Sequence, residues 1–92
     1  MVSFRGDEMK VLKFGGSSVG DANRIRAVIV IIIQSQNAHG KVVVVTSAMQ
    51  DVTNQLIEAG RKAFRGDRTY EQLLSSIEAR HRSVARDLLG TE

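Results

Sequence analysis

The sequence predicts an α/β fold in which a parallel strand–helix–strand unit is followed by two further helices. Two short apolar segments with strand character flank a segment of helical length, and glycines separate these three pieces. Two amphipathic stretches of helical period complete the chain. With 92 residues, 42% of them hydrophobic but only 4% aromatic, the chain can build one modest core from Val, Ile, Leu and Ala.

The first predicted strand covers residues 9–14, because Val11, Leu12 and Phe14 are apolar and no helix or strand breaker comes before Gly15. Residues 1–8 are mostly polar and lack the long apolar stretch of a signal peptide. We interpret residues 1–8 as an N-terminal extension or a cloning remnant, and residues 9–92 as one incomplete domain.

The segment from Asp21 to about residue 37 is rich in Ile and Val, which favour strands by propensity. Its apolar residues nevertheless recur at helical spacing. They are Ile25, Val28, Ile29, Ile32 and Ile33. We therefore predict a helix that ends at Gly40. Because Val30 and Ile31 lie off this stripe, we expect the helix to be covered on more than one side.

The second strand is predicted at residues 42–46, and its four consecutive valines favour burial on both faces, as in a parallel sheet. A two-stranded parallel sheet would leave two open edges and an uncovered face. The chain therefore reads as the N-terminal part of a larger α/β protein, or as one that pairs with another chain.

After a loop at residues 47–51, a helix is predicted from residue 52 to about residue 65, with Asp51 as its N-cap and Gly66 as its stop. Its apolar stripe comprises Val52, Leu56, Ala59, Ala63 and Phe64. A third helix begins at a Thr69/Gln72 capping box and closes at Gly90. Its stripe comprises Tyr70, Leu73, Leu74, Ile77, His81, Val84, Ala85 and Leu88, and we expect His81 to be packed and hydrogen-bonded.

The net charge of +3 does not by itself indicate a nucleic-acid partner. Basic residues alternate with acidic ones, and Glu58/Lys62 and Glu78/Arg82 have the i,i+4 spacing of helix-surface pairs. No aromatic platform accompanies them. The apolar run at residues 27–33 is too short to span a bilayer. We therefore expect no nucleic-acid and no membrane partner.

The sequence contains no cysteine, and its two histidines lie far apart, so no metal site is predicted from metal-ligand spacing. The absence of cysteine fits a cytoplasmic location.

The candidate chemistry begins at residues 13–19, Lys-Phe-Gly-Gly-Ser-Ser-Val. Lys13 ends a strand, Gly15 and Gly16 form a turn, and hydroxyl residues precede a helix. This order suits a phosphate, because glycine exposes backbone N–H groups beside a positive charge. It is neither a Walker loop nor a dinucleotide fingerprint. Two alternatives stay open: the glycines serve the shape of the turn alone, or Lys13 is a solvent-facing edge-strand lysine.

The second candidate lies at the carboxyl end of the second strand, where Ser47 and Ala48 follow Thr46. If the two strands are parallel neighbours, Ser47 lies beside the glycine turn, where its hydroxyl suits a phosphate or a substrate carboxylate. Thr53 and Asn54 begin the next helix and suit an anion at its N-terminus. For all of these hydroxyl and amide residues, a capping or loop role is the alternative.

The motif at residues 13–19 resembles the opening Lys-Phe-Gly-Gly-Thr-Ser-Val signature of the aspartokinases. Residues 42–54, which include Val-Val-Thr-Ser-Ala-Met and then Val-Thr-Asn, resemble a second block of that family at the right distance. The resemblance runs from about residue 9 to residue 89. It implies a three-layer α/β/α sandwich, the amino-acid kinase fold, of which this chain would be a part.

The resemblance also implies a reaction, the ATP-dependent phosphorylation of the side-chain carboxylate of L-aspartate to 4-phospho-L-aspartate, with Mg²⁺. That step begins lysine, threonine and methionine biosynthesis. Lys13 would be catalytic and would stabilise the transferring phosphoryl group. Gly15, Gly16 and Ser17 would donate to the ATP phosphates. The aspartate would be held by Ser47 and Thr53, with Ala48 close by.

Two departures from the family pattern matter. Ser17 stands where threonine is commoner, which keeps the hydroxyl. The rest of the kinase domain and the regulatory ACT modules would lie beyond Glu92, so we expect this chain alone to be inactive. Residues 77–82 resemble those of enzymes fused to a homoserine dehydrogenase domain, and we expect a homo-oligomer. The alternatives are another enzyme of the amino-acid kinase superfamily or a non-catalytic basic interaction module.

Overall fold

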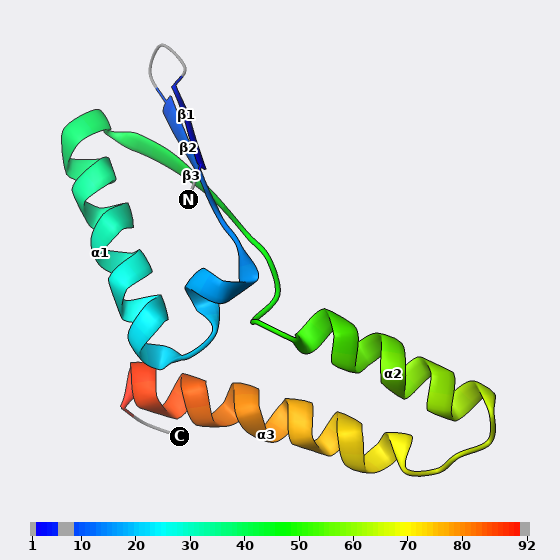
Figure 1. Cartoon of the computed structure of the whole chain (residues 1–92). Coiled ribbons are helices and arrows are strands. Elements are labelled where there is room, and N and C mark those ends of the chain that lie inside the picture. The colour runs from blue at the N-terminus through cyan, green and yellow to red at the C-terminus, as the bar shows by residue number, and fades with distance from the viewer. Residues whose placement is uncertain (1, 6–8, 91–92) are drawn as a thin grey trace. The chain divides into compact units, whose positions relative to one another are not determined.

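The computed structural model describes residues 2–5 and 9–90. In chain order the elements are β1 (Val2–Arg5), β2 (Met9–Phe14), the 3₁₀ turn η1 (Gly16–Val19), α1 (Ala22–His39), β3 (Lys41–Thr46), α2 (Val52–Phe64) and α3 (Tyr70–Leu89) (Figure 1). This order confirms the α/β class, the strand–helix–strand start and the two helices that follow. The chain divides into two compact units, residues 1–50 and residues 51–92.

The first unit contains a three-stranded sheet in the order β1-β2-β3. β2 and β3 pair in parallel, from Met9 opposite Lys41 to Phe14 opposite Thr46. β1 pairs antiparallel with the other edge of β2. The sequence predicts only two strands, so β1, which lies within the presumed extension, corrects that count. An open strand edge presents unpaired N–H and C=O groups, and β1 pairs with them. The domain boundary at residue 9 stays a prediction.

Helix α1 forms where its period predicts and extends to His39, two residues beyond the predicted end. The Asp21 carboxylate caps its first turn, because Oδ1 accepts a hydrogen bond from the Arg24 backbone N–H at 2.8 Å. At the other end, Gly40 adopts a positive φ of 84° and donates its N–H to the Gln36 carbonyl at 2.8 Å. Both helix boundaries therefore follow from local sequence chemistry.

The core of the first unit lies between the sheet and α1 (Figure 1). Its buried members are Leu12, Phe14, Val19 and Val28, with Ile25, Ile31, Ile32 and Val42 packed against them. The predicted stripe of α1 is only partly correct, because Ile29 and Ile33 are 42% and 50% exposed. The buried face is centred on Val28, and each residue turns about 100° around a helix, which carries Ile29 away from the sheet.

The predicted burial of the second strand on both faces is wrong for this chain. Val43, Val44 and Val45 of β3 are all more than 40% exposed, and Val42 alone packs against the core. Val30 of α1 is also exposed, so the expected cover on several sides of α1 is missing too. A valine run determines strand formation locally, but burial requires neighbours. In residues 1–50, α1 covers one face of the sheet, and the third layer of the expected sandwich stays a prediction.

The second unit is a pair of helices, α2 and α3, that pack against one another (Figure 1). Gly66 and Gly90 both have a positive φ and end these helices as predicted. Of the predicted α2 stripe, Val52 and Ala59 are buried, whereas Leu56 is half-exposed and Phe64 is 93% exposed. Phe64 is the last residue of α2.

The polar contacts of the second unit correct the predicted capping box of α3. Thr69 makes no side-chain cap to α3. Its N–H and hydroxyl donate instead to Asp67 Oδ1, at 2.9 and 2.6 Å, so the capping box does not form. Asp51 occupies the N-cap position of α2 without a side-chain hydrogen bond. Its φ of 72° is left-handed.

Two ion-pair predictions have different outcomes. Arg82 bonds Glu78 at 2.9 Å, as the i,i+4 spacing predicts. Lys62, however, pairs with Asp67 at 3.5 Å, and Glu58 pairs with Arg65 at 3.8 Å, which corrects the predicted Glu58/Lys62 pair. The Asp67 carboxylate competes successfully because the chain turns back after α2 and brings it to Lys62.

His81 has the hydrogen bond that the sequence predicts, because its Nδ1 lies 2.7 Å from the Ile77 carbonyl oxygen. The ring itself is exposed rather than packed. In the described part of the chain, none of the helices is long and apolar enough to cross a membrane.

Candidate functional site

The candidate site lies where the parallel strands β2 and β3 end. Their register places Phe14 opposite Thr46, and the Ser47 N–H donates to the Phe14 carbonyl at 3.0 Å. The first residue after β3 therefore lies beside the turn that follows β2. This is the neighbourhood that parallel pairing predicts for Ser47 and the glycine turn, at the carboxyl edge where open α/β sheets bind ligands.

The two glycines of this turn have different surroundings. A Cβ on Gly16 would lie 3.1 Å from the Ala48 carbonyl oxygen and 3.5 Å from the Gln50 Cα atom, so the loop after β3 packs closely over this residue. A Cβ on Gly15 would meet no atom within 4 Å. The close packing of the loop thus requires a glycine at position 16, whereas a side chain at position 15 would meet open space.

The turn itself is the 3₁₀ segment η1, which Gly15 precedes in an extended conformation. The Ser18 N–H donates to the Gly15 carbonyl at 3.1 Å and closes the turn. The N–H groups of Gly16 and Ser17 stand at the start of η1, where a helical turn supplies no internal acceptor. These are the donors that the phosphate interpretation assigns to the loop.

Lys13 is exposed and is the penultimate residue of β2. In register it stands between Val2 of β1 and Val45 of β3, so it belongs to a central strand and not to an edge. The alternation of a strand puts it on the face opposite Leu12 and Phe14, away from α1. The second alternative is therefore half right: Lys13 faces solvent, but from the middle of the sheet.

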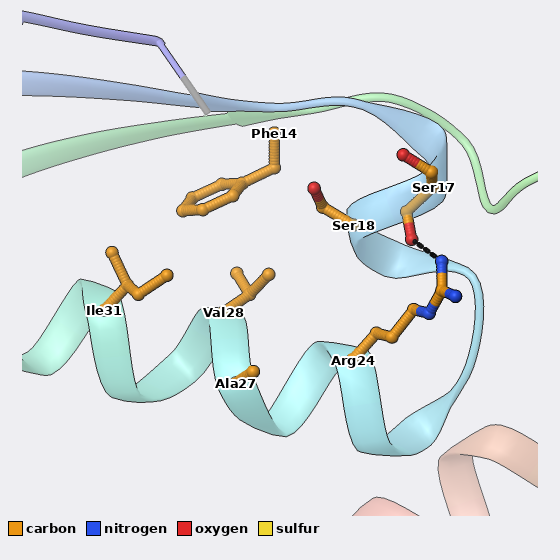
Figure 2. A pocket seen from close by; sticks show the side chains of 7 residues that line it. All are labelled: Phe14, Ser17, Ser18, Arg24, Ala27, Val28 and Ile31. Carbon is orange, nitrogen blue, oxygen red and sulfur yellow. Dashed lines mark hydrogen bonds between the residues drawn. The ribbon is translucent and has the colours of Figure 1, made fainter.

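Arg24 is a residue of the site that the sequence reasoning missed. Its Nη1 donates to the Ser17 carbonyl at 2.8 Å, and its Nε lies 3.8 Å from Asp21 Oδ2 (Figure 2). The available signal was an N-cap aspartate followed three residues later by an arginine, directly after the glycine turn. That pattern places a guanidinium near the turn, but it does not say which carbonyl the guanidinium reaches.

A hollow of about 330 Å³ lies between η1 and α1. Ser17, Ser18 and Arg24 supply its polar groups, and Phe14, Val28 and Ile31 supply apolar walls (Figure 2). The Ser18 hydroxyl points to the side where Phe14 lies, whereas the Ser17 hydroxyl points away from Arg24 (Figure 2). The turn therefore presents its two hydroxyls in different directions.

A second hollow, of about 320 Å³, lies between α1 and the end of β3. Its walls are mostly apolar and include Ile29, Ile32 and Val44, and Ser47 and Met49 lie at one end. Ser47 is exposed, and its carbonyl accepts a hydrogen bond from the Thr46 hydroxyl at 3.1 Å. Both backbone groups of Ser47 are thus engaged, whereas its hydroxyl makes no hydrogen bond within the described residues.

Thr53 and Asn54 lie in the first turn of α2, and both are exposed. They belong to the second unit, whereas Ser47 and Ala48 belong to the first. The grouping of Thr53 with Ser47 and Ala48 therefore stays a prediction. Within residues 2–5 and 9–90, no three His, Cys, Asp or Glu side chains come together as a metal site.

Comparison with known proteins identifies relatives of this chain. The chain is 44% identical over 85 residues to bifunctional aspartokinase/homoserine dehydrogenase 2, chloroplastic, of Arabidopsis thaliana, a match that covers 92% of this chain and 9% of the relative. It is 50% identical over 52 residues to the aspartokinase of Mycolicibacterium smegmatis, covering 56% of this chain and 12% of that enzyme. No solved structure matches.

The bifunctional aspartokinase/homoserine dehydrogenase, chloroplastic, of Daucus carota is 36% identical over 88 residues, which are 96% of this chain and 9% of the relative. The names of these relatives agree with the resemblance of the glycine turn, although the chain spans only a small fraction of their lengths. The sequence profile of the amino acid kinase family matches residues 8–91, nearly the whole chain, and the protein therefore belongs to the amino acid kinase family.

Proposed function

We propose that this chain is the N-terminal part of an aspartate kinase, which uses ATP to phosphorylate the side-chain carboxylate of L-aspartate. The product, 4-phospho-L-aspartate, enters lysine, threonine and methionine biosynthesis. The observation that carries the proposal is the hydrogen bond from Ser47 N–H to the Phe14 carbonyl, which joins the two strand ends at 3.0 Å. It brings the glycine turn and a hydroxyl-bearing loop to one edge of a parallel sheet. The names of the relatives favour aspartate over other acceptors.

In this proposal the glycine turn binds the ATP phosphates. Gly15 is exposed and free of close neighbours, so a phosphate can approach its backbone. The N–H groups at the start of η1, those of Gly16 and Ser17, donate to phosphate oxygens. Because η1 has only four residues, these individual N–H groups contribute more than any helix dipole.

Lys13 supplies the fixed positive charge. Phosphoryl transfer depends on positioning and on stabilising the charge of the transferring group, so it requires no separate nucleophile from the protein. An exposed lysine one residue before the strand end has the reach and the charge for that role. We assign Lys13 to the stabilisation of the transferring phosphoryl group.

The aspartate would lie against the loop after β3. Because the backbone N–H of Ser47 is already bonded to the Phe14 carbonyl, its hydroxyl is the group that we assign to the substrate. Ala48 lies over Gly16 and allows the substrate to approach the turn closely. We also assign Thr53, at the start of α2, to the aspartate, as the resemblance to the aspartokinases implies.

Mg²⁺ accompanies ATP in this reaction class, usually bound by one or two carboxylates together with the phosphates. The described residues contain no group of three or more His, Cys, Asp or Glu side chains that could hold a metal ion, and we assign no carboxylate of this segment to Mg²⁺. We propose that the ATP phosphates hold the ion.

The proposal also includes the surroundings of this chain. The names of the plant relatives combine aspartokinase with homoserine dehydrogenase and include the word chloroplastic. We propose a homo-oligomeric enzyme with further kinase and ACT regions and with a homoserine dehydrogenase domain. Its cytoplasmic location stays a prediction.

The non-catalytic alternative, a basic interaction surface, is less well supported. Three arginines of the second unit are engaged with carboxylates, in Arg65–Glu58, Arg68–Glu71 and Arg82–Glu78. A nucleic acid would have to displace these carboxylates to reach the guanidinium groups.

The test is aspartate-dependent ADP formation by the full-length enzyme, with the acyl phosphate trapped by hydroxylamine. Lys13→Ala should lower kcat by about 10²–10³-fold, the typical loss for a group that stabilises a transition-state charge. Lys10→Ala is the matched control, because Lys10 lies on the same strand about 10 Å nearer the amino end. Ser17→Thr keeps the hydroxyl and should be nearly silent.

Normal turnover by Lys13→Ala would refute the role of Lys13. Wild-type enzyme that forms no ADP in response to aspartate would refute the proposed function. The 92-residue chain alone should show no turnover in this assay.

A further inference from the structure

One side chain reaches from α1 back to the glycine turn. The Arg24 guanidinium donates to the Ser17 carbonyl at 2.8 Å across seven positions of sequence (Figure 2). No role in the reaction proposed above requires this contact, because neither group is assigned to ATP or to aspartate. The bond instead connects the first turn of the helix to the loop that the proposal gives to the phosphates.

Asp21 holds Arg24 in place. Its Oδ1 accepts the Arg24 backbone N–H at 2.8 Å, and its Oδ2 lies 3.8 Å from Arg24 Nε. The Nε edge of the guanidinium thus faces Asp21, while Nη1 donates to the Ser17 carbonyl. A planar fork of donors can satisfy two acceptors in fixed directions, which a lysine ammonium on a flexible stem does not do.

The Ser17 carbonyl belongs to a rigid unit. It shares a planar peptide group with the Ser18 N–H, which donates to the Gly15 carbonyl at 3.1 Å. That carbonyl in turn shares a planar peptide group with the Gly16 N–H. Two peptide planes therefore connect Arg24 to Gly16, and the direction of the Gly16 N–H depends on the hydrogen bonds at both ends.

We propose that Arg24, oriented by Asp21, is a positioning residue for the phosphate-binding turn. By fixing the Ser17–Ser18 peptide plane it aims the Gly16 N–H, one of the donors assigned to the ATP phosphates. This inference rests on the proposed function. It predicts that loss of the guanidinium lowers the affinity for ATP. The affinity for aspartate, which Ser47 and its loop are proposed to bind, should change little.

The kinetic test compares Arg24→Ala, Arg24→Lys and the control Arg26→Ala in the full-length enzyme. Arg26 lies on the same helix and donates to Asn23 Oδ1 within α1 at 2.8 Å. Arg24→Ala should raise KM for ATP about tenfold, the loss expected for one hydrogen bond to a charged group. KM for aspartate should stay within about twofold, and Arg26→Ala should keep both constants near the wild-type values.

Two further readouts separate positioning from simple helix stability. Arg24→Lys should recover only part of the ATP affinity, and millimolar guanidinium added to Arg24→Ala should lower KM for ATP again. Equal increases in both KM values, or full recovery with lysine, would overturn the positioning role. A capping role for Arg24 alone would also lower thermal stability without changing the ratio of the two KM values.

Hydrogen exchange tests the same bond without any activity. In both the 92-residue chain and the full-length enzyme, the amides of residues 15–19 should exchange faster in Arg24→Ala than in wild type or Arg26→Ala. Unchanged exchange would overturn the inference even if the enzyme phosphorylates aspartate. If exchange rises in Arg24→Ala while the wild-type enzyme shows no aspartate-dependent turnover, the proposed function is refuted. The role of Arg24 in fixing the glycine turn is then still supported.

Discussion

The two units of this chain are stabilised in different ways. Residues 1–50 bury Leu12, Phe14, Val19 and Val28 between a sheet and a helix. In residues 51–92, α3 contains no buried residue, and polar contacts such as Lys62–Asp67 and Arg82–Glu78 lie at the surface. The glycine turn thus belongs to a packed unit, whereas the α2–α3 pair depends to a greater extent on exposed groups.

The two kinds of stabilisation contribute different amounts to the free energy of folding. Complete burial of a large apolar side chain contributes about 1.5–3 kcal/mol, and an exposed ion pair contributes about 0.2–1 kcal/mol. Substitutions of the same chemical kind should therefore have unequal effects in the two units. The comparison teaches that the site is supported by side chains underneath it, even though its own residues are exposed.

The largest expected effect contrasts two phenylalanines. Phe14 is 1% exposed and Phe64 is 93% exposed. Phe14→Ala should lower the free energy of unfolding by about 3–5 kcal/mol, because the hydrophobic contribution of the buried ring is lost and a cavity remains beneath the glycine turn. Phe64→Ala should change it by less than about 0.5 kcal/mol. Urea unfolding followed by circular dichroism measures both.

Phe14→Leu is the folded reference for this comparison, because it keeps most of the volume and should cost less than about 1.5 kcal/mol. Equal losses for Phe14→Ala and Phe64→Ala would contradict the assigned difference between the two units.

The elements with a strong local period could be predicted from the sequence. The strand at Met9–Phe14, the helix after Asp21 and the stops at Gly40 and Gly90 all follow from patterns within a few residues. The exposure of β3 could not be predicted in that way, because burial depends on neighbours that a valine run implies but does not contain. The additional strand β1 was missed for the same reason, because its pairing depends on the open edge of β2 and not on its own sequence pattern.

The site was predictable to the extent that it depends on topology. Parallel pairing brings Ser47 to the turn at Gly15 and Gly16, and a strand–helix–strand order implies such pairing. The Arg24 contact with the Ser17 carbonyl was missed because it depends on the side-chain path across the start of α1. The capping box at Thr69 failed because Asp67, two residues earlier, competes for the same hydroxyl.

A smaller effect should separate the two glycines of the turn. An alanine at Gly16 would place its Cβ 3.1 Å from the Ala48 carbonyl oxygen, a backbone atom, so the loop must shift. We expect a loss of about 1–3 kcal/mol, typical of overpacking. Gly15→Ala meets open space and has an ordinary negative φ, so its stability should change little or rise by up to about 1 kcal/mol.

Thermal unfolding of the two variants without nucleotide measures this difference, because no ligand then contacts Gly15. A stability loss at Gly15 as large as that at Gly16 would refute the close packing of the loop after β3 over the turn.

The smallest expected effect concerns the turn between α2 and α3. The pKa of Asp67 is lowered from its ordinary 3.8, first because its carboxylate accepts the Thr69 hydroxyl and backbone N–H, and then because Lys62 lies close. Lys62 Nζ stands 3.5 Å from Asp67 Oδ2 and also donates to the Thr69 hydroxyl oxygen at 3.1 Å. This exposed group of three polar side chains takes the place of the predicted capping box.

Because the folded-state pKa of Asp67 is lowered, its stabilisation is complete above the unfolded value of 3.8 and is lost as the pH falls through the lower folded value. The thermal midpoint of wild type should therefore drop slightly more on acidification than that of Asp67→Asn, which cannot titrate. Thr69→Val removes the largest cause of the shift and should move the Asp67 titration, followed by carboxyl carbon NMR, back toward 3.8. An unmoved titration in Thr69→Val would contradict the assignment of the Thr69 hydroxyl as the main cause, and would leave the backbone N–H of residue 69 and Lys62 as the groups that lower the pKa of Asp67.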